Sequence, residues 1–284
     1  HSPTAVRASI LVGVEAALDH DWDVSLPMPP VALQFVLRLA LGIAVGIGLT
    51  PASLAARGFY RLSCWCLLFL GVAGAAWVHL NSEPAEQPGA VIFLAIALSV
   101  LACAAAALYQ RGRDEAGRAA VFAAGLSAVL AVALATSWSR VTSGVGMWLA
   151  LADLVSSGLL LGVTMAALWL GLWHLNTSSA ERLPWAQLAW VAGASLAVRT
   201  VLGVLGLGIA VFASRPVPGL FWLFLVFRWG MALLTWCMLR VLAREVRRPL
   251  DQQAVAVLVY LALFASLAGE LGSQLVPVEI PYTV

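Results

Sequence analysis

Long apolar stretches separated by short polar segments run along the chain. Each stretch is close to the ~20 residues that an α-helix needs to cross a bilayer. Runs of this length, rich in Leu, Ala and Val, satisfy their backbone hydrogen bonds in lipid by forming helices. Strands of a barrel would instead show alternating apolar and polar residues in segments of ~10 residues. We therefore predict an all-α, polytopic membrane bundle of about eight transmembrane helices. The expected spans are residues 31–50, 62–80, 89–109, 119–138, 146–174, 185–213, 218–243 and 253–276.

One transmembrane domain, residues 31–276, is the simplest division, because the connecting loops are short and contain no Ser- or Pro-rich linker. Residues 1–30 hold a short apolar run followed by acidic residues. The run is too short to span and favours an interfacial or partner-docking helix. A start at His1 rather than Met would fit the loss of a signal peptide before an exported N-terminus. Residues 277–284 are expected to form an exported tail.

The distribution of arginine predicts the orientation. The chain has no lysine, and cytoplasmic loops carry an excess of basic residues. One side of the predicted bundle carries Arg57, Arg61, Arg111, Arg113, Arg118, Arg182, Arg240, Arg244, Arg247 and Arg248. The other side carries Arg7, Arg140 and Arg215. This bias predicts that both termini lie outside the cytoplasm, for a multi-pass protein of a bacterial inner membrane.

Composition supports the membrane assignment and excludes several classes of function. Hydrophobic residues make up 62% of the chain and charged residues 11%, against roughly 25% charged in soluble domains. The sequence contains no phosphate-binding loop, zinc-protease motif or hydrolase elbow, so we expect no catalytic residue and no metal site. Nucleic-acid binding is also excluded, because the arginines follow the membrane topology. The cysteines fall inside predicted spans and are expected to be small core residues: Cys64, Cys66, Cys103 and Cys237.

Five ionisable residues inside the spans are the most specific feature: Arg38, Asp153, Arg199, Arg228 and Glu270. Each is costly at membrane depth, by at least ~2.5 kcal/mol, and should face protein or water beside a partner. With the predicted orientation, all five fall between the outer leaflet and the midplane. They could pair as Arg–Asp and Arg–Glu with one arginine left over. A guanidinium with unfilled donors could bind a carbonyl, carboxylate or phosphate oxygen, or an acid of a partner subunit.

Two interpretations of this layer stay open. The charges are structural ion pairs between helices, or they line a quinone or lipid site that includes Gln274 on the face of Glu270. His174, at the inner end of its span, is either an interfacial cap or a proton or quinone contact. His79 lies at the opposite face, and a bis-histidine haem needs ligands at matching depth. We therefore expect no haem in this chain alone, and no cofactor other than a quinone.

Three segments resemble a family of uncharacterised eight-helix bacterial integral membrane proteins: 171–177, the Arg228–Trp229 pair, and 269–275. In that family the first motif tends to read Gly-His-Trp-Tyr-Leu, so the histidine is displaced here. The chain is also similar in layout to the NrfD/DmsC-type membrane anchors of respiratory oxidoreductases, with His79-Leu80 followed by Pro84. That similarity implies quinol binding and docking of electron-transfer subunits.

The function expected from the sequence is a non-catalytic integral subunit of a bacterial membrane complex. The complex would be respiratory or electron-transferring, with scaffolding and quinone or lipid binding near the outer leaflet. Its partners would be other subunits and lipids. The alternative is a small-solute transporter in which the Arg/Asp/Glu layer is the substrate site and Gly203–Gly208 supplies a hinge.

Overall fold

Long α-helices make up the part of the chain that the computed structural model describes, namely residues 28–52, 55, 57–81, 89–139, 144–176, 185–212, 219–245 and 252–275. These ranges contain eight helices and no strand, which confirms the all-α prediction. The helices are α2 (Met28–Leu49), α3 (Arg57–Asn81), α4 (Gly89–Gln110), α5 (Asp114–Ser139), α6 (Gly144–Asn176), α7 (Trp185–Phe212), α8 (Gly219–Glu245) and α9 (Gln252–Leu275). The predicted docking helix within residues 1–30 and the tail at 277–284 lie outside the described residues, apart from the first turn of α2.

Two helices begin about five residues before the apolar run that predicted them. The first turn of α3 starts at Arg57, and that of α5 contains Asp114 and Glu115. Acidic side chains in a first turn are stabilised by the N-terminal end of the helix dipole. The acidic first turn of α5 therefore continues that helix beyond the hydrocarbon-length segment, which apolar patterning alone cannot detect.

The described helices are those of a multi-pass membrane protein. Seven of them are long and apolar enough to cross a bilayer, and α8 is the helix outside that set. Large apolar side chains also cover the outer surface, with Leu80 79% exposed and Phe93 69% exposed. A soluble monomer rarely exposes apolar patches of this extent, whereas lipid tails solvate them.

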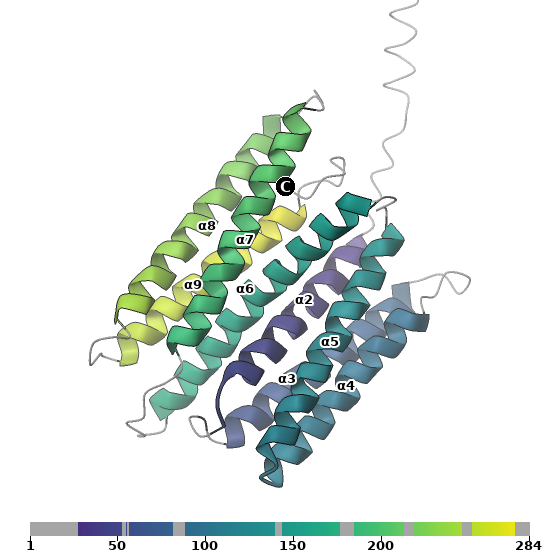
Figure 1. The fold of residues 1–284 in the computed structure, drawn as a ribbon, viewed down its shortest axis with the longest axis vertical. Helices are drawn as coiled ribbons and strands as arrows, with labels where there is room; N and C mark the ends of the chain where they lie inside the picture. The colour runs from purple at the N-terminus through teal and green to yellow at the C-terminus, as the bar shows by residue number, and fades with distance from the viewer. Residues whose placement is uncertain are drawn as a thin grey trace, which may run out of the picture.

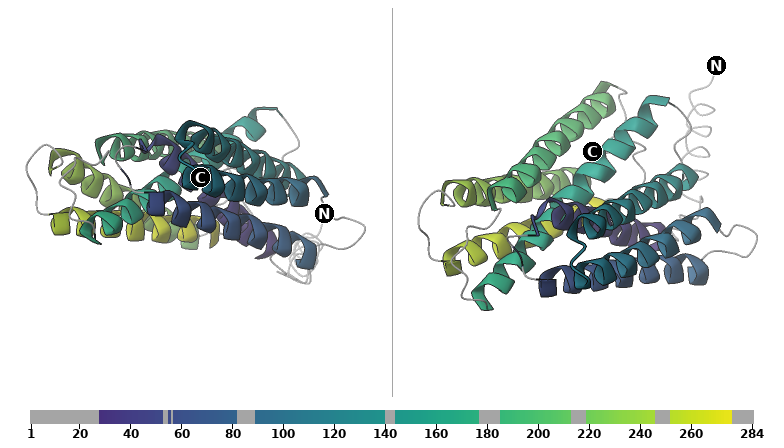
Figure 2. Two further views of the ribbon diagram at one scale, coloured as in Figure 1. Left: turned by 90° about the horizontal axis from the view of Figure 1, so that it is seen from below. Right: turned by 60° about the horizontal axis from the view of Figure 1, so that its bottom comes forward.

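The helices pack as two groups of four. In the first group, α2 contacts α3 and α5, and α4 contacts α3 and α5. In the second group, α6 contacts α7 and α9, and α8 contacts α9 and, over fewer residues, α7. The extensive contact between α2 and α6 joins the groups, and Figure 1 shows these two helices side by side at the centre. Figure 2 shows from two further directions that the axes of all the helices are broadly aligned.

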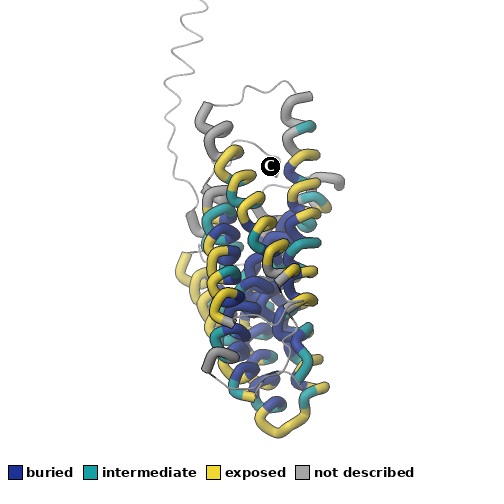
Figure 3. The backbone as a smooth tube through the Cα atoms, turned by 90° about the vertical axis from the view of Figure 1, so that its left-hand side faces the viewer, coloured by how far each residue is buried: buried dark blue, intermediate teal, exposed yellow. Residues whose placement is uncertain are grey.

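Burial follows from this arrangement. Buried residues form a continuous interior with exposed residues outside them, as Figure 3 shows. In the apolar segment of α6, 78% of residues are buried, against 33% in the corresponding segment of α3. α6 is therefore a central helix of the bundle, and α3 faces outward along much of its length.

Glycines allow α2 and α6 to approach closely. A Cβ added to Gly42 would collide with the carbonyl oxygen of Gly158 and would lie 2.7 Å from the Cα of Gly162. A Cβ added to Gly158 would lie 2.7 Å from the carbonyl oxygen of Arg38. Small residues at a spacing of four are the usual means of bringing two helix backbones together in membranes. The closest contact of the two halves is therefore where Gly42 meets Gly158 and Gly162, one turn of α2 beyond Arg38.

Replacing Gly162 with alanine is expected to destabilise the protein, because its Cβ would collide with the backbone of Gly42. We expect a loss of about 1–3 kcal/mol, typical of overpacking. Gly193→Ala is the matched control, since a Cβ there meets nothing within 4 Å. The control should be neutral or stabilising by about 0.5–1 kcal/mol. Thermal unfolding in detergent, followed by circular dichroism, measures both; equal midpoints would contradict the close crossing.

Candidate functional site: a buried ion-pair cluster

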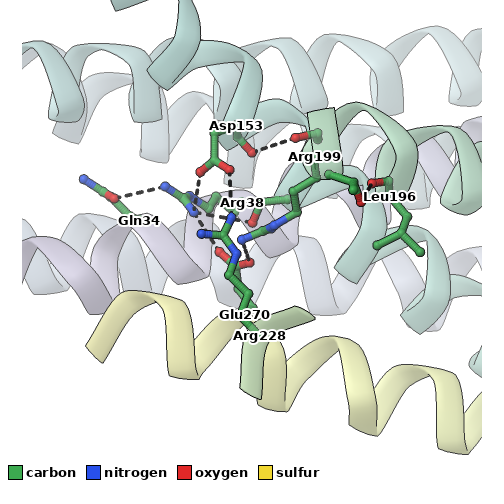
Figure 4. A network of polar contacts seen from close by, with 10 residues as sticks. Gln34, Arg38, Asp153, Leu196, Arg199, Arg228 and Glu270 are labelled. Atoms are coloured by element: carbon green, nitrogen blue, oxygen red, sulfur yellow. Dashed lines mark hydrogen bonds and ion pairs between the residues drawn. The ribbon is translucent and has the colours of Figure 1, made fainter. Parts of the chain in front are cut away.

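The five ionisable residues singled out from the sequence meet in the interior of the bundle. We call them the ion-pair cluster: Arg38 on α2, Asp153 on α6, Arg199 on α7, Arg228 on α8 and Glu270 on α9. Figure 4 shows the three arginines converging on the two carboxylates. Arg38 comes from one group of four helices and the other members from the second group. The cluster therefore spans the junction between the two groups.

All five residues lie in the same half of the bundle. Measured from the end where α2, α6 and α8 begin, they lie ~8 to 20 Å along their helices at 1.5 Å per residue. Four of them are buried, among them Glu270, which is 3% exposed. Arg228 is the most accessible member, with a side chain 15% exposed. At this depth an unpaired charge is costly, so pairing is the condition for these residues to be there.

Glu270 is held by two arginines. Nη1 of Arg38 donates to Oε1 of Glu270 at 2.8 Å, and Nη2 of Arg199 pairs with Oε2. The hydroxyl of Ser157 on α6 also hydrogen-bonds to this carboxylate. One side chain of α9 thus connects to α2, α6 and α7. Charge-assisted bonds of this kind are roughly twice as strong as neutral ones.

Asp153 is held less tightly. Its Oδ1 lies 3.5 Å from Nη2 of Arg228, and its Oδ2 lies 4.0 Å from Nη1 of Arg38. Arg38 also contacts Oγ of Ser157 at 3.4 Å and Oε1 of Gln34 at 3.3 Å. Arg38 is therefore the bridge between the two acids and between the two groups of helices.

The pairing differs from the expected one in one respect. The sequence suggested two Arg–acid pairs with one arginine left over, but each arginine contacts an acid because Glu270 is shared by Arg38 and Arg199. Sharing is possible because an ionised carboxylate has two acceptor oxygens, and each oxygen of Glu270 pairs with a different arginine. It does not change the sum of formal charges, so the cluster keeps one surplus positive charge.

A pocket of about 490 Å³ lies against the cluster between α7 and α8, with α9 beneath it. Its polar end is formed by Arg199, Arg228 and Glu270, and its walls are otherwise mostly apolar. Two wall residues in the middle of their helices are turned to the outer surface, with Val201 58% exposed and Leu233 62% exposed. The pocket therefore connects the ion-pair cluster with the apolar surface of the bundle. Aromatic side chains along this wall are Trp229 and Trp236.

Ser266 is an unusual member of the pocket lining. It is 6% exposed, and its hydroxyl has no hydrogen-bond partner among the described residues. Hydroxyls on neighbouring helices instead donate to the carbonyl four residues earlier, as do Ser195, Thr200 and Thr235. Ser266 precedes Glu270 by one helical turn, so both lie on the same face of α9. The pocket thus has one further polar residue next to the cluster.

The structure does not describe the side chains of two predicted site residues. His174 and Gln274 lie on the last turns of α6 and α9, but their side chains lie outside the described residues. Among the residues that are described, no group of three or more His, Cys, Asp or Glu side chains could hold a metal ion.

Several contributors were not predicted from the sequence. Gln34 lies one turn before Arg38 and accepts from it, a spacing that the sequence already displays. Gly158 and Gly162, in the segment Gly-Leu-Leu-Leu-Gly, are the α6 half of the close crossing with α2. The small-residue spacing was a visible signal there. The aromatic wall of the pocket had no such signal, because it depends on how α7 and α8 are rotated.

Comparison of the chain with protein-family models, with curated proteins and with solved structures finds no match. The class of the protein therefore follows from the fold and the site themselves. It is a multi-pass helical membrane protein with a buried cluster of arginines and carboxylates beside a pocket on its apolar surface.

Glu270→Gln is expected to destabilise the protein strongly, because Arg38 and Arg199 would lose the carboxylate that both contact. Removing one partner of a buried ion pair costs about 3–5 kcal/mol. Glu115→Gln, the same substitution at an exposed position in the first turn of α5, should cost about 1 kcal/mol or less. Unfolding midpoints in detergent compare the two, and similar shifts would argue against a stabilising cluster.

Proposed function

We propose that this protein is an integral membrane subunit without a reaction of its own. It binds an amphiphile from the bilayer, a lipid or a quinone. The head group lies at the ion-pair cluster, and the tail lies along the apolar walls of the pocket. The observation that carries the proposal is the pocket itself, which connects buried arginines to the apolar surface between α7 and α8.

The dimensions and chemistry of the pocket suit such a ligand. Ligand pockets commonly measure ~300–1,000 Å³ and combine apolar walls with a few polar groups that fix orientation. Here the polar groups gather at one end, and apolar side chains such as Leu233 and Trp236 lead to the surface. A guanidinium suits carbonyl, carboxylate and phosphate oxygens, whereas indole and leucine side chains suit an acyl or isoprenoid chain. A ligand that enters sideways from lipid fits this arrangement.

We propose further that all eight helices span the membrane. α8 has 27 residues, which is long enough for a bilayer. Among its charged residues, Arg228 faces the cluster, and Arg240 and Arg244 lie toward its end. Arginines near a helix end can extend to the membrane surface. The packing of α8 against α9 supports this assignment.

The proposed orientation puts both termini outside the cytoplasm of a bacterial inner membrane. It is supported by exposed arginines that gather at one end of the described bundle, at the start of α3 and between α4 and α5: Arg57, Arg61, Arg111 and Arg113. By the positive-inside rule this end faces the cytoplasm. The ion-pair cluster then lies in the outer half of the membrane. A place in a respiratory or electron-transfer complex rests on the layout similarity to quinol-binding anchors, and the small-solute transporter stays the alternative.

Filling the pocket tests the binding function. Gly203 lines the pocket, and a Cβ there meets nothing within 4 Å, so Gly203→Trp occupies the space without a backbone collision. Gly193→Trp on the same helix is the control, since it is equally open and outside the pocket. Lipids and quinones extracted from the purified protein are quantified by mass spectrometry. We expect one tightly retained amphiphile in the parent and the control and none in Gly203→Trp; identical extracts from all three would refute the proposal.

Orientation is tested by labelling single cysteines in a variant whose native cysteines are replaced by alanine. Asn81 at the end of α3 and Arg113 between α4 and α5 are both exposed and are separated by one helix. A membrane-impermeant maleimide should label Asn81→Cys in intact spheroplasts and Arg113→Cys only after lysis. The reverse pattern would invert the proposed orientation.

A further inference from the structure

We infer that the head group bound in this pocket carries one negative charge and is held by Arg228, so that the ligand is an acidic lipid rather than a neutral quinone. This inference rests on the proposed function and specifies the ligand of the same site. The shared chemistry is an anionic oxygen group, such as a phosphodiester, on a molecule that enters from the bilayer.

The first step is charge balance. Three guanidinium groups share two carboxylates, which leaves one positive charge in a low-dielectric interior. A buried charge without compensation is unfavourable, and an ion from outside the cluster can supply the compensation. One negative charge is what the cluster lacks. A neutral quinone would fill the pocket and leave this charge as it is.

The second step is the position of the least satisfied arginine. Arg38 and Arg199 both pair with Glu270, deep in the cluster. Arg228 pairs with Asp153 at 3.5 Å, which is longer than the ~2.9 Å of a good hydrogen bond. It also lines the pocket and has the most exposed side chain of the three arginines. The surplus charge is therefore reachable at Arg228, where a ligand oxygen can accept from the remaining donors.

The third step is the unsatisfied hydroxyl. Ser266 is buried on the pocket wall and has no hydrogen-bond partner among the described residues. Buried polar groups without a partner are rare and require an explanation. The oxygen of Ser266 is enclosed, so the side chain has to rotate about its Cα–Cβ bond before an oxygen-rich head group beside α9 can accept from it. The charge of Arg228 and the hydroxyl of Ser266 thus favour the same kind of ligand.

In the test, the delipidated full chain is incubated with two lipids that have identical acyl chains. Phosphatidylglycerol has a net negative charge, and the phosphate of phosphatidylcholine is neutralised by its own cation. Bound lipid is counted by native mass spectrometry from detergent micelles. We expect the parent to retain phosphatidylglycerol about tenfold better, a difference of about 1.4 kcal/mol. Gly203→Trp should retain neither lipid.

Charge variants identify the residue responsible. Arg228→Gln makes the cluster neutral and should abolish the preference, whereas Arg228→Lys keeps the charge and should preserve it. Arg244→Gln, the same change at an exposed position on α8, should have no effect. Asp153→Asn raises the surplus positive charge of the cluster to two and should increase the preference for phosphatidylglycerol. This variant therefore tests the role of charge even if Arg228→Gln does not fold.

The outcomes separate this inference from the function beneath it. Equal retention of both lipids that Gly203→Trp still removes would overturn the acidic head group and leave amphiphile binding in place. Retention unaffected by Gly203→Trp would refute both. A third arm adds excess glycerol 3-phosphate, which has the anionic group without the tails. It should not displace the lipid; effective displacement would identify a soluble anion as the ligand and overturn the inference.

Discussion

The shared carboxylate of Glu270 is the interaction on which the rest of the structure depends. A bilayer interior offers no water to a charged group, so every ionised side chain must find its partner within the protein. Glu270 contacts Arg38 and Arg199, and Arg38 reaches on to Asp153, which contacts Arg228. Each buried charge lowers the cost of burying the opposite charge beside it. Five helices are thereby tied together at one level, and removing either acid leaves an arginine without its carboxylate.

This network requires α2 to lie very close to α6, and backbone packing provides that condition. Gly158 of α6 lies against the carbonyl of Arg38, and the closest approach of the two helices, at Gly42, follows one turn further along α2. Ser157, the preceding residue, contacts the guanidinium of Arg38. A larger residue at Gly158 would separate α2 from α6 and withdraw Arg38 from both acids. Close packing at glycines, which have no side chain, and the pairing of charges therefore act together to join the two groups of helices.

The sequence predicted the helices and the members of the cluster, but not how they combine. Apolar length defines a transmembrane helix locally, and an ionisable residue within such a helix is conspicuous because of its cost. Partner choice depends on the rotation and tilt of five helices, which no single helix encodes. Glu270 was therefore not identified as shared by two arginines, and one arginine was expected to be left over. The apolar walls of the pocket escaped prediction for the same reason, since Trp229 and Leu233 line a space that exists only where α7 and α8 separate.

The position of the surplus charge links packing to binding. Had Arg199 carried the weaker pair, the uncompensated charge would lie deep in the bundle, where its side chain is 9% exposed. Instead, the weaker pair belongs to α8, which contacts α7 less than it contacts α9. A looser contact between two helices normally weakens a bundle, but here it opens the interior at the one arginine whose acid is 3.5 Å away. The same feature that leaves the cluster incomplete therefore gives a ligand from the bilayer access to complete it.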